Sequence, residues 1–418
     1  MNAYIISIGD ELLIGQTINT NASFIGEKLS ENNINVVKVA TIGDDEKAIL
    51  DEFKTAYETG DIVLVSGGLG PTHDDITRTC VVKFFKTELI ENEEVLEDIE
   101  ILFKKRNWKV SDLNKAQALV PKVSTPIRNP RGTAPGMWID KDDKFFCVMP
   151  GVPYEMKGMM EDFVIPTLAE SMKDSGIVIK RRILQTTGIP ESTLAERLGD
   201  IEELLQGSKL AFLPSIGGVK LRITSEAKTD EEANSRLTEI EQKIRAKAGR
   251  FIFGKDEDTL ETVVAKLLTE RDLKIATAES CTGGLIADTL TNISGSSSYF
   301  ERGIVSYSNA SKVELLRVDE DALAKHGAVS LEVAMQMAAG VKAISGSDIG
   351  IAVTGIMGPT GATTDKPVGL VYIGFCDDNV CTVKKFIFGN DRLLNKQRTL
   401  YAALDMVRKQ LLGISLDD

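Results

Sequence analysis

The chain has 418 residues and an ordinary globular composition, with 43% hydrophobic and 27% charged residues, which is length enough for about three domains. Its formal net charge of −13 repels polyanions, so direct binding to nucleic acid is not expected. The chain has two histidines, His73 and His326, so a zinc site rich in imidazole is not expected either. Hydrolytic chemistry would have to use carboxylates, hydroxyls, lysines and backbone dipoles.

The sequence also indicates where the protein works. No apolar run approaches the roughly 18 residues that span a bilayer, and the N-terminus lacks the features of a signal peptide. The cysteines are odd in number and show no C-x-x-C spacing, which favours reduced thiols in a cytoplasm over a disulfide framework. We therefore expect a cytoplasmic protein without membrane contact, in which all five thiols are reduced: Cys80, Cys147, Cys281, Cys376 and Cys381.

The first part of the chain alternates short β-branched runs with amphipathic stretches. This alternation is typical of βαβ units and a mostly parallel sheet, whose ligands bind beyond the carboxyl ends of the strands. The loops 9–16 and 66–77 should therefore share one rim. Strands are predicted at 4–8, 34–40, 61–65 and 144–149, with helices at 19–32 and 45–59.

The pattern changes twice further along the chain. Residues from about 175 to 255 suggest a small α+β module with a hairpin at Gly217–Gly218, and a second α/β unit follows. In the module, strands are predicted at 178–186, 210–213 and 219–226, with helices at 191–205 and 229–248. In the last unit, strands are predicted at 274–278, 303–307, 348–353, 369–375 and 382–388, with helices at 258–270, 282–293, 330–345 and 391–412.

The predicted fold class is accordingly α/β. We expect two three-layer α/β domains with mostly parallel sheets, joined by the small α+β module. The predicted domains are 1–172, 173–255 and 256–418.

The segment AESCTGG, residues 278–284, lies where a predicted strand turns into a helix. Ser280 and Thr282 would lie near free N–H groups and the positive end of the helix dipole, which suits an anion or an acyl oxyanion. The alternative is a plain helix cap, which Ser and Thr also favour. A nucleophilic serine needs a base, and Lys312, after a neighbouring strand, is the natural candidate unless it is only a surface charge. Cys281 is a rival nucleophile whose side chain should point into packing.

Several motifs across about 260–412 resemble the C-terminal domain of the CinA family: AESCTGG, FERGIVSYSNASK, HGAVS, VTGIMGPTG, KPVGLVYIGF and a late G-N-D-R. The resemblance implies an amidohydrolase that needs no cofactor and converts nicotinamide mononucleotide to nicotinate mononucleotide and ammonia. It implies Ser280 as nucleophile, Lys312 as base and Tyr307 at the catalytic centre. The residues implied to bind substrate are Thr282, Gly283, Gly284, Asn309, Thr354, Gly355 and Gly358. Met357 stands where a smaller residue, often alanine, is expected.

A second candidate site lies in the segment SGGLGPTHDDIT, residues 66–77. Glycines let the backbone approach a phosphate, and threonine hydroxyls add donors. Two adjacent carboxylates would repel that phosphate unless a divalent cation bridged them, although Asp75 could instead serve at the start of a helix. The phosphate-binding candidates are Gly67, Gly68, Gly70, Thr72 and Thr77, and the metal candidates are Asp75 first, then Asp74, Asp10 and Glu11.

The motifs GDELLIGQTINTN, GGLGPTHDDIT, NPRGTAPG and MPGVPYEM resemble the molybdopterin-binding, MoaB-like domain that CinA proteins carry. In that setting the resemblance implies an ADP-ribose pyrophosphatase that uses magnesium, manganese or cobalt. The middle module resembles the KH-like domain of CinA proteins, and the family implies a homodimer. Two alternatives stay open. The N-terminal half could bind a pterin or nucleotide without hydrolysis, or the whole chain could be a non-catalytic accessory of competence or DNA damage.

Overall fold

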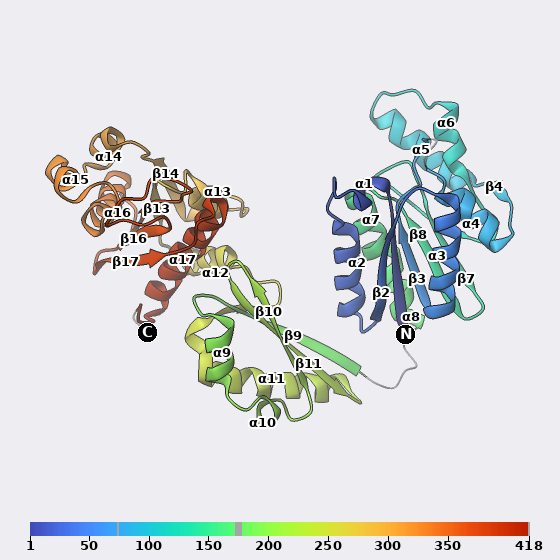
Figure 1. Cartoon of the computed structure of the whole chain (residues 1–418), viewed down its shortest axis with the longest axis horizontal. Coiled ribbons are helices and arrows are strands. Elements are labelled where there is room, and N and C mark those ends of the chain that lie inside the picture. The colour runs from blue at the N-terminus through green and yellow to red at the C-terminus, as the bar shows by residue number, and fades with distance from the viewer. Residues whose placement is uncertain (73–74, 172–177, 417–418) are drawn as a thin grey trace. The chain divides into compact units, whose positions relative to one another are not determined.

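The computed structural model describes residues 1–72, 75–171 and 178–416, and Figure 1 shows its helices and strands. The chain divides into two compact units, Met1–Gly176 and Ile177–Asp418. Among the described residues, no helix is long and apolar enough to cross a membrane.

A six-stranded sheet forms the centre of the N-terminal unit, in the order β2-β1-β3-β8-β7-β6. The four strands from β2 to β8 are parallel, and β7 and β6 continue the sheet in antiparallel fashion. The strands predicted from the sequence of this unit are all present. The bounds are β1 Asn2–Ile8, β2 Asn35–Ile42, β3 Ile62–Ser66, β6 Thr125–Ile127, β7 Gly136–Lys141 and β8 Lys144–Met149.

Helices cover both faces of this sheet (Figure 1), as a three-layer fold requires. Alternate residues of a strand point to opposite faces, so Ile5 packs against the helices of one face and Tyr4 against those of the other. The first face carries α2 Thr20–Glu31, α7 Pro153–Met159 and α8 Ile165–Ser171, and the second carries α3 Glu46–Thr59 and α4 Thr77–Phe85. Smaller elements are α1 Asp10–Leu13, β4 Leu89–Glu91, α5 Glu93–Lys105, α6 Asp112–Lys115, a 3-10 turn at Ala116–Ala118 and β5 Leu119–Pro121.

The second unit begins with the small α+β module. Its sheet has the order β10-β11-β9-β12, and the predicted hairpin joins β10 to β11, where Ser215 pairs with Gly218. The single helix expected over 191–205 is wrong: it divides because Gly199 has a positive φ of 72° and Asp200 caps a new helix. The bounds are β9 Val178–Thr186, α9 Glu191–Leu198, α10 Ile201–Leu205, β10 Lys209–Ser215, β11 Gly218–Ala227, α11 Asp230–Ala248 and β12 Ile252–Lys255.

The rest of the second unit is a three-layer α/β domain around a mixed sheet, β14-β13-β15-β16-β17. The first three strands are parallel and the last two are antiparallel. The bounds are β13 Ile275–Glu279, β14 Phe300–Val305, β15 Ile349–Gly355, β16 Leu370–Cys376 and β17 Cys381–Ile387. One face packs against α12 Leu260–Glu270, α13 Leu285–Thr291 and α17 Arg392–Leu412, and the other against α14 Asn309–Leu316, α15 Glu320–His326 and α16 Leu331–Ser345.

One expectation about the cysteines is wrong. Cys376 and Cys381 form a disulfide, because the β16–β17 hairpin places these two residues directly opposite each other. The spacing of five residues was the available sequence signal, since two antiparallel strands joined by a short turn bring such a pair into register. Cys80, Cys147 and Cys281 are free and buried.

Candidate functional sites

In the C-terminal domain, two neighbouring parallel strands bring Ser280 and Lys312 together. Ser280 directly follows β13, and its N–H donates to the carbonyl of Val353 at 3.1 Å. Lys312 lies on α14, which follows β14. The Nζ of Lys312 is 3.0 Å from the Oγ of Ser280, and the two residues are 1% and 9% exposed. The predicted proximity of the hydroxyl and the amine is therefore present.

The surroundings of Lys312 favour an uncharged amine. Its Nζ also donates to the carbonyls of Ser306 at 2.7 Å and Tyr307 at 3.4 Å. Burial lowers the pKa of Lys312 from its ordinary value, because the ammonium form loses its hydration. The alternative of a solvated surface lysine is thus contradicted.

The carboxylate of Glu279 lies at the start of α13, where the sequence predicted a bound anion or oxyanion. Its carboxylate is almost fully buried and accepts hydrogen bonds from the N–H groups of Gly284, Ile286 and Ala287, at 3.0, 3.1 and 2.8 Å. These N–H groups, expected to be free, are therefore occupied. The alternative in which Ser280 or Thr282 caps the helix is also contradicted, because the N-cap of α13 is Gly284 and the Glu279 carboxylate accepts from the N–H groups at the start of this helix.

Cys281 is poorly suited to be the nucleophile. Its side chain joins the hydrophobic core, as expected. Burial raises the pKa of the Cys281 thiol to about 12, so the reactive thiolate is scarce at neutral pH.

The other predicted residues of this site have diverse surroundings. Tyr307 is exposed, and its hydroxyl accepts from Nη2 of Arg392 at 3.1 Å. The hydroxyl of Thr354 donates to the carbonyl of Ala328 at 2.8 Å, so this hydroxyl is not free to donate to a substrate. Asn309 is the first residue of α14, and Gly355 ends β15. Gly283 lies exposed in the turn after Ser280. The carbonyl of Gly358 accepts from Arg392 at 3.2 Å. The hydroxyls of Thr282 and Ser306 are buried without a partner among the described residues.

Sequence reasoning missed the cations beside this site, although it noted the G-N-D-R segment. Arg392 begins α17, and the ammonium of Lys396 lies near Gly283, 3.8 Å from where a Cβ would be. Asn395, fully buried, donates to the carbonyls of Met357 at 3.0 Å and Gly389 at 2.7 Å. The side chain of Met357 packs in the core. The first turns of α17 therefore hold the loop that follows β15 and supply positive charge.

The N-terminal unit has a cavity of about 360 Å³ at the expected rim of its sheet. It is lined by the glycine loop after β3 and by residues that follow β1 and β8. Gly67 and Gly68 have φ of +121° and +64°, and a Cβ would lie 2.1 Å from the Ile8 carbonyl oxygen and from the Thr77 Oγ1, respectively. Glycine is therefore required at both positions for this loop to close.

Asp75 organises the end of that loop. Its carboxylate accepts from both the N–H, at 3.0 Å, and the hydroxyl of Thr72, and Asp75 and Gly70 line the cavity. The alternative in which Asp75 caps a helix is not what the structure has, since the N-cap of α4 is Ile76.

The metal candidates do not form a closed protein cage. Glu11 lines the cavity, whereas the carboxylate of Asp10 accepts from the N–H of Asp44 at 3.2 Å. Asp74 lies outside the described residues. Among the residues that are described, no three His, Cys, Asp or Glu side chains are placed to bind one metal ion. Asp75 and Glu11 fit instead an ion held by one or two carboxylates together with substrate phosphates, as Mg²⁺ often binds.

Two buried side chains at this site have unpartnered polar atoms. Gln117 lines the cavity and is 2% exposed, and within the described chain neither its Nε2 nor its Oε1 has a partner. Thr77 Oγ1, beside Gly68, has none either. Arg78 fixes the segment that carries Gln117, because its Nη1 donates to the carbonyls of Ala116 at 2.8 Å and Leu119 at 3.2 Å. No sequence signal singled out Gln117.

A half-buried carboxyl, that of Glu155, also lines this cavity. Burial raises the pKa of Glu155, although the amide of Asn129, which donates at 2.7 Å, lowers it. Asn129 also donates to the carbonyl of Ala134 and accepts from the N–H groups of Arg131 and Gly132. The NPRG segment thereby becomes a rigid turn that holds Glu155.

These folds and sites define a three-part protein, with a molybdopterin-binding-type α/β domain, a KH-like module and an α/β domain that carries a serine–lysine pair. Residues 4–170 match the family described as "Probable molybdopterin binding domain", residues 181–254 the "Damage-inducible protein CinA KH domain", and residues 257–411 the "CinA C-terminal domain".

Relatives extend this match to the whole chain. The "CinA-like protein" of Chloroherpeton thalassium is 45% identical over 420 residues, which cover 98% of this chain and 99% of that protein. A relative from Caldicellulosiruptor saccharolyticus is 43% identical over 413 residues, 99% of this chain and 100% of its own. A solved structure of the competence/damage inducible protein CihA from Agrobacterium tumefaciens is 39% identical and covers 37% of this chain and 93% of its own, with a TM-score of 0.36. The chain belongs to the CinA family.

Proposed function

We propose that the C-terminal domain hydrolyses the amide of nicotinamide mononucleotide to nicotinate mononucleotide and ammonia. The observation that carries this proposal is the 3.0 Å separation of the Lys312 amine and the Ser280 hydroxyl, both withdrawn from solvent. A serine becomes a nucleophile only when a base accepts its proton, and the lowered pKa of Lys312 supplies that base.

The proposed reaction proceeds through an acyl-enzyme. The Oγ of Ser280 attacks the carboxamide carbon while Nζ of Lys312 takes the hydroxyl proton, and the same proton then goes to the departing amine, which leaves as ammonia. A water molecule attacks the resulting ester, Lys312 accepts its proton, and the acid product leaves as Ser280 is restored. No cofactor is needed for these steps.

An anionic substrate suits the charges around Ser280. Arg392 and Lys396 come from the start of α17 and lie beside the loops that flank the serine. A guanidinium and an ammonium bind a phosphomonoester well, even on a chain whose net charge is −13. We therefore assign the substrate phosphate to these two cations.

The direct test is ammonia release from nicotinamide mononucleotide by the purified protein. Ser280→Ala should reduce turnover by at least about a thousandfold, as loss of a nucleophile does in serine hydrolases. Cys281→Ala is the matched control, and it should keep activity because that thiol is buried and protonated. Activity that survives in Ser280→Ala and disappears in Cys281→Ala would reverse the assignment.

For the N-terminal unit we propose metal-dependent hydrolysis of ADP-ribose to AMP and ribose 5-phosphate. The cavity of about 360 Å³, with its glycine loop and the carboxylates of Glu11 and Asp75, supports this second activity. Magnesium, manganese or cobalt would be held by these carboxylates and the diphosphate, and would neutralise the charge of the phosphates. The chain's own part is to orient the diphosphate through the backbone of residues 67–70.

Two alternatives predict different results. If the N-terminal unit binds a pterin or nucleotide without hydrolysis, ADP-ribose should persist in the presence of each of the three metals. If the chain is an accessory of competence or DNA damage, it should bind DNA in a salt-sensitive manner, against which the acidic net charge argues.

We also propose that the protein works in the cytoplasm as a homodimer with small nucleotides as its partners. Light scattering coupled to size exclusion tests the dimer. The Cys376–Cys381 disulfide weighs against a fully reduced protein, and thiol counting after extraction from cells would show whether it forms there.

A further inference from the structure

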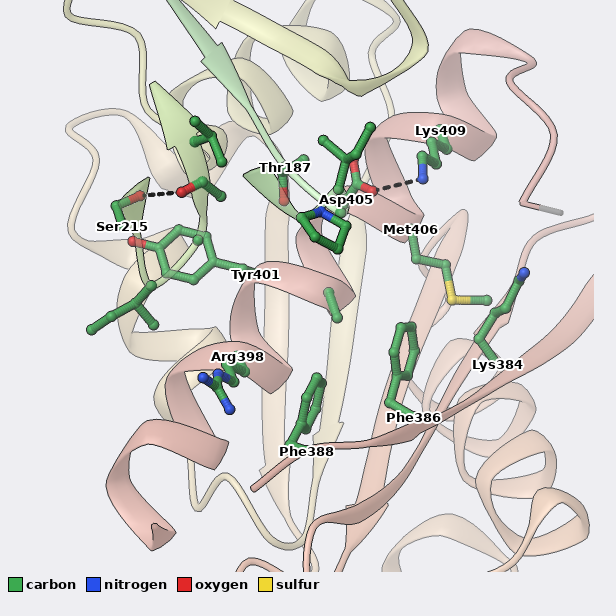
Figure 2. Close-up of a pocket in the computed structure, with 18 of the residues that line it drawn as sticks. Thr187, Ser215, Lys384, Phe386, Phe388, Arg398, Tyr401, Asp405, Met406 and Lys409 are labelled. Carbon is green, nitrogen blue, oxygen red and sulfur yellow. Dashed lines mark hydrogen bonds and ion pairs between the residues drawn. The ribbon is translucent and has the colours of Figure 1, made fainter. Parts of the chain in front are cut away.

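The second unit contains a cavity of about 640 Å³ that neither proposed activity uses. The small module supplies one wall, through residues 187–191 and the hairpin at 214–219. Strand β17 and helix α17 of the C-terminal domain supply the other. Figure 2 shows the side chains that line it.

Aromatic rings dominate one side of this cavity. Phe386 of β17 and Phe388, the residue after the end of β17, stack with ring centroids 5.6 Å apart and planes inclined by 14°. Tyr401 reaches the cavity from α17 (Figure 2) and packs on the hairpin, where a Cβ at Gly217 would lie 2.7 Å from its ring. The rings are partly exposed and held in place, so they offer π-faces to a planar ligand.

The cavity also carries a cation without a counter-ion. Lys409 is paired with Asp405 at 2.9 Å, and the ammonium of Lys384 donates to the carbonyl of Leu416. Arg398 of α17 lines the cavity together with Phe388 (Figure 2), and no salt bridge or hydrogen bond of its guanidinium occurs within the described residues. Three cations and two carboxylates, the second being Glu191, give the lining a net charge of +1, whereas the whole chain carries −13.

The size and lining of this cavity are those of a ligand site. Ligand sites are apolar, aromatic cavities of roughly 300–1,000 Å³ with a few placed polar groups, and this one has about 640 Å³, three aromatic rings and the guanidinium of Arg398. A cavity lined by an arginine and by aromatic rings matches a ligand with a planar ring and an anionic group, because a guanidinium binds phosphate through two parallel hydrogen bonds.

We propose that this cavity binds an aromatic phosphomonoester of mononucleotide size, with its base against Phe388 and Tyr401 and its phosphate on Arg398. The site is separate from both proposed hydrolase sites and does not depend on either activity. The cavity borders α17, and on this helix Asn395, one turn before Arg398, binds carbonyls of the loops near Ser280. A ligand here would contact the same helix that shapes the candidate amidase site.

The test is photolabelling of the full chain with 8-azidoadenosine 5′-monophosphate, followed by mapping of the labelled peptides. Peptide mapping separates this cavity from other nucleotide sites on the chain. We expect label within 187–191 or 214–219, two segments that line this cavity and contribute nothing to either proposed hydrolase site. Arg398→Ala should reduce that label about tenfold or more, since it removes a charge-assisted bond to phosphate. Arg398→Lys should retain part of it, and the exposed Arg271→Ala is the matched control that should retain all of it.

Several outcomes would overturn the site. These are absence of label from both segments at millimolar probe, undiminished label in Arg398→Ala, and equal label by 8-azidoadenosine, which lacks the phosphate. Circular dichroism checks that each variant is folded. Because the phosphate-free probe is used on the unaltered protein, the phosphate requirement is tested even if Arg398→Ala does not fold.

Discussion

The two candidate sites occupy the same place in their folds, beyond the carboxyl ends of central parallel strands, but their polar groups are satisfied differently. In the C-terminal site the two groups that would react are partnered, since Lys312 bonds to Ser280 and to the Ser306 carbonyl. The buried hydroxyls there that lack a partner among the described residues, those of Thr282 and Ser306, are not the reacting groups. In the N-terminal cavity, Gln117 and Thr77 hold buried polar atoms without partners in the described chain. Buried polar atoms are normally bonded, so we read the first site as a preformed reacting pair and the second as a cradle that its ligand completes.

The largest effect expected from this comparison is on the reacting pair. Lys312→Met keeps the length and burial of the side chain but removes the base, so ammonia release should fall about a thousandfold, within the range that general-base catalysis supplies. Binding of nicotinamide mononucleotide, measured by calorimetry, should persist.

Lys312→Arg separates a base from a mere positive charge. A guanidinium cannot lose its proton in a protein, so this variant should be as inactive as Lys312→Met. Retained turnover in Lys312→Arg would mean that the residue acts as a cation, and the preformed acid–base pair would be wrong.

The pH dependence should be the next largest effect. Burial lowers the pKa of Lys312 below the ordinary 10.5, and only the neutral amine can accept the proton of Ser280. The kcat/KM for ammonia release should therefore rise about tenfold per pH unit and level off at the lowered pKa. A profile that still climbs at that slope through pH 10.5 would show that the lysine is not perturbed.

The sequence predicted the fold and the reacting pair because both follow from patterns along the chain. Alternating β-branched and amphipathic stretches located the strands of both sheets and the long helices. The topological rule for parallel sheets then placed the loops after β13 and β14 at one rim. The residues Ser280 and Lys312 meet for that reason.

What the sequence could not predict are contacts made by side chains that look ordinary. Glu279 reads as the end of a buried strand, yet its carboxylate binds three backbone N–H groups of the next helix. Gln117 lies in a short turn with no motif around it. Its place in the cavity depends on the hydrogen bond of Arg78 to this turn and on the glycine loop after β3. Such contacts depend on tertiary distances, which periodicity does not contain.

Glu279→Gln tests how the reacting pair is held. The amide keeps one acceptor but presents an NH₂ group to N–H donors, so the loss of charged hydrogen bonds should destabilise the C-terminal domain by about 2 kcal/mol. Ammonia release should fall at least about tenfold, since small misplacements of a reacting group are costly. Thermal unfolding by circular dichroism and the ammonia assay measure the two effects.

Asp288→Asn is the matched control, because this exposed carboxylate lies in the first turn of the same helix. It should change stability by no more than about 0.5 kcal/mol. Equal losses in the two variants would mean that negative charge near the helix start, rather than the buried bonds of Glu279, holds the loop.

The smallest effect tests the incomplete cradle. Gln117→Leu replaces two unpartnered polar atoms with an apolar group of similar size, so the N-terminal unit should gain up to about 1 kcal/mol of stability while ADP-ribose binds about tenfold more weakly. Unfolding can be followed by the fluorescence of Trp108 and Trp138, the chain's two tryptophans, which both lie in this unit. Asn129→Leu is the comparison, because the Asn129 amide is fully bonded and its loss should destabilise the unit. If Gln117→Leu destabilises as Asn129→Leu does, the Gln117 amide is already satisfied in the free protein, and the contrast between the two sites fails.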